Sequence, residues 1–212
     1  LVGHSESILV AAPDKDSAAL IQKAIDSLPA QRTFIGTVKP VGEFNLEKGL
    51  KLPDYTRLDL SEARLKLADG VKEPVVANAD YENGNRHIEI VGGFIDGNKK
   101  GQGVGDFHGI LFMRVEQARI TDLDVVNCSG DGIRLNGKGK HTRDVQLRNL
   151  RLVDNNRCGL NVKWAERNIF VSDIYAIGNK EFGIRSDHSE GLYQNICANS
   201  NRGHGIFIRN IF

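Results

Sequence analysis

Cysteine is scarce in this sequence, and its placement excludes a disulfide framework. Three cysteines cannot all pair with one another. Cys128, Cys158 and Cys197 also fall at three different phases of the repeat described below, so they do not stack in one column. We expect free thiols buried in the core.

A surplus of charge and long apolar runs are also lacking. The 28 lysines and arginines nearly balance the 27 aspartates and glutamates, so no strong overall field favours nucleic acid or an anionic membrane. No apolar run approaches the roughly 20 residues of a membrane span. Aromatic residues are few, whereas glycine, at 23 residues, is abundant, as a turn-rich β fold requires. We therefore expect neither a nucleic-acid nor a membrane partner.

What the sequence has instead is an internal repeat. Apolar residues alternate in short period-2 runs at fixed distances from a recurring pair of glycine and aliphatic residue. A repeat of this length is typical of a solenoid, and period-2 runs between polar turns predict strands. We predict an all-β parallel β-helix, a single domain over residues 1–212 with regular coils over 88–212. The pairs are 23, 27, 24 and 22 residues apart: Gly109-Ile110, Gly132-Ile133, Gly159-Leu160, Gly183-Ile184 and Gly205-Ile206.

Asparagine recurs at one turn of the repeat, four residues before the glycine. It stands at Asn155, Asn179 and Asn201, and Cys128 takes the same place one coil earlier. We predict that the three amides stack in one column and bond one another across coils. Replacing Asn179 with alanine would then destabilise the fold by about 1–3 kcal/mol, because neighbouring amides lose buried partners.

The N-terminal part predicts a cap over the open end of the stack. Apolar residues recur at helical spacing within residues 14–29, and Pro29 ends the segment. Asp14, Asp16 or Ser17 can cap the start of this helix. Such a helix would shield the first coil from edge pairing. The side chains expected to face the first coil are Ile21, Ala24, Ile25 and Leu28.

The remaining segments are less regular. We expect a first edge strand at residues 8–10, one or two irregular coils over 33–70, a polar excursion over 71–87 and an inserted loop over 98–108. The chain ends without a second capping segment. We therefore expect further coils in a longer protein, or a partner subunit such as a second copy, to cover the exposed side chains of Ile206, Ile208 and Phe212.

Several segments resemble the pectin lyase-like superfamily of right-handed parallel β-helices. They are AALIQKAIDSLP, TRLDLSEARLKLADG, IEIVGGFIDGN and NCSGDGIRL. The resemblance covers residues 14–212 and implies a right-handed β-helix with an elongated groove that holds a polysaccharide. Members of the superfamily include polysaccharide lyases, polygalacturonase-type hydrolases, alginate epimerases and phage tailspikes.

Individual motifs of that superfamily match only in part. Gly203-His204-Gly205 is similar to the Gly-His-Gly of polygalacturonases, but the stretch Ser129–Gly132 has one aspartate, Asp131, where those enzymes have a pair. An inverting hydrolase needs two carboxyl groups about 6.5–9.5 Å apart. The segment from Phe182 to Glu190 resembles a catalytic segment of alginate epimerases, with altered spacing.

The repeat register predicts a patch of polar side chains on one outer face. Side chains alternate across a strand, so positions two and four after the repeat glycine point outward, and adjacent rungs bring them within about 5 Å. The patch contains the only tryptophan of the chain. Its members are Arg134, Asn161, Lys163, Trp164, Arg185, Asp187 and His188.

Each of these residue types suits an acidic polysaccharide. Arg134 and Asn161 would bind substrate, with the guanidinium neutralising a carboxylate and Trp164 packing on a sugar ring. Lys163 is the first candidate for the base, although a neighbouring carboxylate at Asp187 would raise a lysine pKa and weaken it as a base. Arg185 or His188 is the alternative base, and Asp187 or His188 could act as an acid. The competing interpretation is an ordinary polar surface with a Lys163–Asp187 salt bridge worth under about 1 kcal/mol.

Metal and cofactor expectations are weaker. The patch contains no metal set, and we do not expect zinc because histidines and cysteines are scattered over different phases. A Ca²⁺ site could use carboxylates at Asp122, Asp124, Asp154 and Asp173, but no three of their oxygens line up in the repeat. The basic loop at 136–144 borders the patch, either as a rim for an anionic glycan or as a solvated loop.

The repeat, the patch and the resemblance leave three interpretations of the function. The first is an extracellular carbohydrate-active enzyme acting on an acidic polysaccharide, a lyase or epimerase in preference to a hydrolase. The second is a non-catalytic glycan-binding module of tailspike or adhesin type, on a virion or cell surface. A purely structural solenoid is the third alternative.

Overall fold

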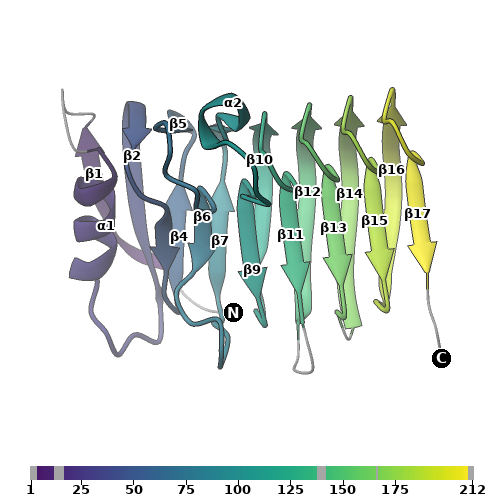
Figure 1. Cartoon of the computed structure of the whole chain (residues 1–212). Helices are drawn as coiled ribbons and strands as arrows, with labels where there is room; N and C mark the ends of the chain where they lie inside the picture. The colour runs from purple at the N-terminus through teal and green to yellow at the C-terminus, as the bar shows by residue number, and fades with distance from the viewer. Residues whose placement is uncertain (1–3, 12–16, 138–141, 166, 210–212) are drawn as a thin grey trace.

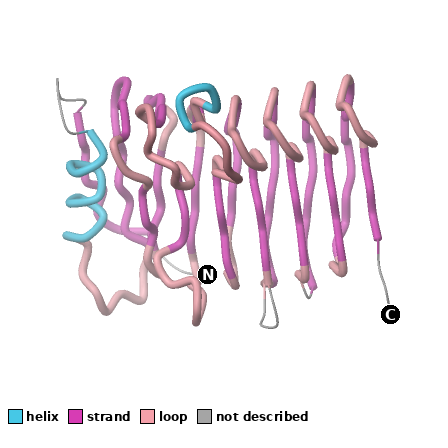
Figure 2. Tube along the Cα trace, in the orientation of Figure 1, coloured by secondary structure: helices cyan, strands magenta, loops and turns pink. Residues whose placement is uncertain are grey.

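The chain forms a parallel β-helix in the computed structural model, which describes residues 4–11, 17–137, 142–165 and 167–209. Two parallel sheets run the length of the stack, with polar turns between them (Figures 1 and 2). Sheet A has ten strands and sheet B has seven, one for each coil. The strands of sheet A are β1 (His4–Ala11), β2 (Ile35–Leu46), β4 (Thr56–Asp59), β5 (Glu62–Leu67), β7 (Ile88–Val91), β8 (Phe94–Asp96), β10 (Arg119–Val126), β12 (Arg143–Val153), β14 (Arg167–Ile177) and β16 (Gly191–Asn199). Those of sheet B are β3 (Leu50–Leu52), β6 (Val76–Asn78), β9 (Ile110–Met113), β11 (Ile133–Asn136), β13 (Leu160–Lys163), β15 (Ile184–Asp187) and β17 (Ile206–Arg209).

The predicted register is confirmed rung by rung. The aliphatic residue after each repeat glycine pairs with its equivalent on the next coil, from Ile110 through Ile133, Leu160 and Ile184 to Ile206. The inward positions of sheet A are similarly aligned, as Leu123, Leu150, Ile174 and Ile196 illustrate. These columns form one continuous hydrophobic core along the stack.

In the regular coils each strand of sheet A is bent in its middle. The bend is a single residue with left-handed backbone, at Asp122, Asn149, Asp173 and Asn195 on successive coils. Aspartate and asparagine tolerate this conformation better than other non-glycine residues. The Nδ2 of Asn149 donates to the Oδ1 of Asp122 at 2.8 Å, and that of Asn195 donates to Asp173 at 3.0 Å. Because amides alternate with carboxylates along this column, two negative charges never stand on adjacent coils.

The asparagine ladder is also confirmed. The Nδ2 of Asn155 donates to the Oδ1 of Asn179 at 2.9 Å, and the Nδ2 of Asn179 donates to Asn201 at the same distance. The backbone N–H of Cys128 donates to Asn155 at 3.0 Å, which puts Cys128 in the expected place. The repeat glycine is required because the backbones of adjacent coils come very close at this position. A Cβ on Gly159 would lie 2.7 Å from the carbonyl oxygen of Gly183 on the next coil.

The N-terminal cap is confirmed. Helix α1 (Ser17–Ser27) lies at the end of the stack beside β1 and β2 (Figure 1). Ile21 and Ile25 are fully buried, and Leu28 packs so closely on Gly36 that a Cβ there would lie 2.7 Å from it. The proposed capping residues Asp14 and Asp16 lie outside the described residues.

Three expectations need correction. The polar excursion contains strand β6, because Val76 pairs with Ile110 of the next coil. The inserted loop contains a short helix, α2 (Lys99–Gln102), anchored by buried Gln102. Cys128 and Cys158 are buried free thiols as expected, but Cys197 is exposed, because it takes an outward position of β16. At the other end Ile206 and Ile208 are 45% and 55% exposed, whereas Phe212 lies outside the described residues.

Candidate functional site

Five of the seven residues predicted to share one outer face lie on adjacent rungs of sheet B, and the other two lie in the turn that follows this sheet. Arg134 pairs with Asn161 and Asn161 with Arg185, while Lys163 pairs with Asp187. Rungs about 4.8 Å apart bring these side chains close together, but Asn161, expected to face outward, is buried. We call this surface the sheet B patch: Arg134, Asn161, Lys163, Trp164, Arg185, Asp187 and His188.

Trp164 and His188 occupy the turn that follows sheet B on successive coils. Both have left-handed backbone, with φ of 51° and 50°, which is uncommon for bulky side chains. The two rings lie 6.3 Å apart, and the Nζ of Lys163 lies 4.2 Å from the centre of the indole ring. Trp164 remains 38% exposed. The same backbone conformation recurs at Arg114, at the equivalent turn of an earlier coil, so it belongs to the turn of the repeat, and the exposed indole is what distinguishes Trp164.

Asp187 is buried, which corrects the expectation of an exposed carboxylate. Arg185 Nε donates to its Oδ2 at 2.6 Å, and Arg209 Nε, one coil further, donates to its Oδ1 at 2.9 Å. The predicted Lys163–Asp187 salt bridge is therefore wrong, because two guanidinium groups take both carboxylate oxygens. Arg209, which sequence reasoning left out of the site, joins the patch through this contact.

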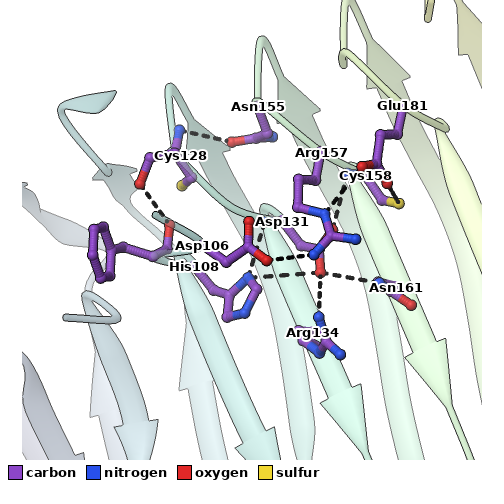
Figure 3. Close-up of polar contacts among 12 residues, drawn as sticks. Asp106, His108, Cys128, Asp131, Arg134, Asn155, Arg157, Cys158, Asn161 and Glu181 are labelled. Carbon is purple, nitrogen blue, oxygen red and sulfur yellow. Dashed lines mark hydrogen bonds and ion pairs between the residues drawn. The ribbon is translucent and has the colours of Figure 1, made fainter. Parts of the chain in front are cut away.

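A second buried carboxylate, Asp131, lies at the edge of the patch, in the turn before β11 (Figure 3). Its Oδ1 accepts the backbone N–H of Cys158 at 3.0 Å. Its Oδ2 accepts Asn161 Nδ2 at 3.0 Å and Arg134 Nη1 at 3.4 Å. Asp131 thus orients two patch residues from two coils. The sequence signal was available, since Asp131 is an acidic residue directly before a repeat glycine.

His108 packs beside Asp131 from the preceding coil (Figure 3). The backbone N–H of Asp131 donates to His108 Nδ1 at 2.9 Å, so this nitrogen carries no proton. Burial lowers the pKa of His108 below its ordinary value; Asp131 opposes this shift and Arg134 reinforces it. The 3.6 Å separation of Nδ1 from the Asp131 carboxylate is therefore no ion pair at neutral pH.

This arrangement predicts a pH dependence of stability. In the unfolded chain His108 takes up a proton near pH 6.5, whereas in the folded chain its lowered pKa delays protonation to a lower pH. The free energy of unfolding therefore decreases as the pH falls below about 6.5. We expect the thermal midpoint to fall less between pH 7 and 5 in His108→Asn, whose Oδ1 can accept the same N–H. The exposed His204→Asn variant should keep the wild-type slope, and parallel profiles for all three proteins would contradict the assignment.

The loops above the patch carry a charged rim. Arg157 Nη1 lies 2.5 Å from Asp106, and its Nε donates to Glu181 at 3.1 Å. Figure 3 shows this guanidinium between the two carboxylates and near Asp131. Burial raises the pKa of the neighbouring Cys158 thiol, and the charge of Asp131 adds to this, so it is no nucleophile at neutral pH.

An aromatic cluster extends the patch toward β17. Phe182 stacks on His204 and Phe207, with ring centres 5.8 and 5.1 Å apart, and the Arg185 guanidinium lies 5.7 Å from the Phe182 ring. His204, matched above to a catalytic motif, is an exposed member of this cluster. Its neighbours are therefore rings instead of the carboxylates that hydrolysis needs.

Among the described residues, no group of three or more histidine, cysteine, aspartate and glutamate side chains could hold a metal ion. Three of the carboxylates considered for Ca²⁺ contact amides or arginines instead: Asp122 accepts from Asn149, Asp124 from Arg151 and Asp173 from Asn195. Residues 138–141 of the predicted basic rim lie outside the described part. No helix in that part is long and apolar enough to cross a membrane.

No model of a known protein family matches the chain. It is 30% identical over 207 residues to the putative phage-related protein YobO of Bacillus subtilis (strain 168), an alignment that covers 90% of this chain and 23% of that protein. It is 28% identical over 163 residues to the preneck appendage protein of Bacillus phage PZA, with 71% and 18% covered.

Among solved structures, the pre-mature bacteriophage phi29 gene product 12 superposes with a TM-score of 0.63 at 19% identity, over 92% of this chain and 31% of that one. This likeness concerns the fold, and so does the resemblance to the pectin lyase-like superfamily. The chain spans less than a quarter of either sequence relative. It is similar to segments of larger phage and phage-related proteins, and it shares its fold with part of the phi29 protein.

Proposed function

We propose that this chain is a glycan-binding segment of a phage appendage protein, and that the sheet B patch holds an acidic polysaccharide without turning it over. The observation that carries the proposal is the chemistry of the patch. With Arg209 and Asp131 included, it has four cationic side chains against two carboxylates, next to a half-exposed indole. A surplus of positive charge attracts an anionic polymer.

Two buried atoms in the patch await a partner. Asn161 Oδ1 and His188 Nδ1 have no hydrogen-bond partner among the described residues. Asn161 gives its Nδ2 to Asp131, which leaves the oxygen as an acceptor (Figure 3). A buried unpaired polar atom costs about 1–3 kcal/mol, and a sugar hydroxyl would recover part of this cost.

The spacing of the rungs suits a polymer that lies along the stack. Successive coils present equivalent side chains about 4.8 Å apart, close to the length of one sugar unit. In this arrangement Arg134 and Arg185, two coils apart, would face the carboxylates of every second sugar unit, while Trp164 packs on the ring between them.

Binding is favoured over catalysis because most of the candidate acids and bases are already engaged, and His188 alone among them keeps a ring nitrogen without a partner in the described part of the chain. Asp187 and Asp131 are buried and each accepts hydrogen bonds from arginine. Lys163 lies over the Trp164 ring. A general base must reach the proton it removes, and a lyase or epimerase using Lys163 would first have to withdraw it from the indole. The names of the relatives support a location on the virion.

The test is a titration of oligogalacturonate into the wild-type chain and Trp164→Gly, followed by calorimetry. Glycine fits the left-handed backbone at 164 without strain, so the variant loses the ring and keeps the fold. We expect affinity to fall about tenfold, equivalent to about 1.4 kcal/mol. The control Tyr175→Ala removes an exposed aromatic ring from sheet A and should bind like the wild type.

Two results would count against the proposal. If the wild-type chain binds no polyuronate, the sheet B patch does not hold a polyuronate. Absorbance from an unsaturated product would instead establish a lyase, and Lys163→Ala should then abolish turnover.

A further inference from the structure

The outer face of sheet A, opposite in the coil to the sheet B patch, is hollowed along the stack. Two adjoining hollows of about 670 and 690 Å³ share Arg119 and Gln146, and so form one groove across several coils. We call it the sheet A groove. The outward side chains that matter for its chemistry are Glu89, Arg119, Gln146, Arg148, Phe170 and Tyr175.

Two aromatic side chains stand open in this groove. Phe170 and Tyr175 lie on β14, on either side of the bend at Asp173, and are 50% and 52% exposed. Phe170 lines the first hollow and Tyr175 the second. The rings of the aromatic cluster beside sheet B stack on one another, whereas Phe170 and Tyr175 line the groove with half of their surface exposed. Flat apolar surface of this kind suits the face of a sugar ring.

The charges of the groove exclude an anionic ligand. Arg119 lies 3.6 Å from Glu89, and Arg148 lies 3.5 Å from Asp173, so each lining arginine already faces a carboxylate. Asp122 and Asp144 add two further negative charges to the lining. The groove therefore has four carboxylates against two arginines, the reverse of the sheet B patch.

Amide side chains supply the remaining polarity. Gln146 lies in both hollows, and its Oε1 accepts Arg119 Nε at 3.1 Å. Asn149 on the same strand and Asn168 on the next strand also line the groove, and each donates Nδ2 to a carboxylate. An amide offers both donors and acceptors, which matches the hydroxyl groups of an uncharged sugar.

We propose that the sheet A groove is a second glycan-binding site, and that its ligand is an uncharged polysaccharide lying along the stack. One sugar ring packs on Phe170 and another on Tyr175, while Gln146 and the neighbouring amides bind hydroxyl groups. The two faces of the β-helix then select by charge. The sheet B patch takes acidic glycans, and the sheet A groove takes neutral ones.

The experiment is an array of uncharged and anionic glycans probed with the wild-type chain, Phe170→Ala, Tyr175→Ala and Trp164→Gly. We expect the wild type to retain at least one uncharged glycan, and each sheet A variant to bind it about tenfold more weakly because a buried apolar contact is lost. Trp164→Gly should bind that glycan normally. Since Phe170 and Tyr175 are exposed, all variants should keep the wild-type thermal midpoint.

Three results would overturn the proposal. The wild-type chain could retain no uncharged glycan, Trp164→Gly could bind the glycan as weakly as the sheet A variants do, or both sheet A variants could bind it as tightly as the wild type. Sedimentation is measured in parallel, because a change of oligomeric state in Phe170→Ala would show that a second copy of the chain covers this face. Failure of the sheet B proposal leaves this test intact, since binding of an uncharged glycan is expected to depend on Phe170 and Tyr175, whereas binding of an acidic glycan is expected to depend on Trp164.

Discussion

Replacing Asp131 with alanine is expected to lower the free energy of unfolding by about 3–5 kcal/mol, the cost of removing one partner from a buried ion pair. The variant leaves the Arg134 guanidinium, the Asn161 amide and the Cys158 backbone N–H without the carboxylate that they share. These three groups belong to two coils, so the loss should loosen the stack between them. Urea unfolding monitored by circular dichroism measures the change.

The matched control is Asp106→Ala. Asp106 is also paired with an arginine, but its side chain is 57% exposed, and exposed ion pairs contribute about 0–1 kcal/mol. If the free energy of unfolding falls by the same small amount in both variants, the contacts of Asp131 do not hold this turn together. If Asp131→Ala is severe, binding tests on Arg134 must be interpreted as tests of a residue that Asp131 positions.

Replacing Asn179 with alanine is expected to destabilise the fold by close to 3 kcal/mol, the upper end of the range for orphaned buried groups. Asn179 is fully buried and makes contacts in both directions. Its Oδ1 accepts the side chain and backbone N–H of Asn155, and its Nδ2 donates to Asn201 and to the Leu152 carbonyl. Alanine leaves all four groups without this partner.

The neighbouring exposed residue supplies the control for the ladder. Lys180 lies in the same turn with its side chain exposed, and Lys180→Ala should change the free energy of unfolding by less than about 0.5 kcal/mol. Equal unfolding midpoints for Asn179→Ala and Lys180→Ala would contradict the ladder's role in stability. A drop in the slope of the denaturation curve would instead indicate that the stack unfolds in parts.

The sequence by itself determined the repeat, the register and the ladder. In a solenoid each coil contacts its neighbours at the same phase, so spacing along the chain translates directly into columns in space. This is why the pairing of Arg134 with Asn161, and the stacking of Asn155 on Asn179, could be predicted without coordinates. The capping helix could also be predicted, because its apolar residues recur at helical spacing and the segment stands directly before the first coil.

Only the tertiary structure decided which outward side chains are accessible. Alternation places Asp187 on the outer face, but whether an outward carboxylate meets solvent depends on arginines that reach it from the same strand and from the next coil. Asp131 was missed as a positioning residue because its partners converge from different coils through turns, which have no fixed period. The sheet A groove was missed because a hollow depends on the bend of each strand and on the size of neighbouring side chains, and alternation specifies neither.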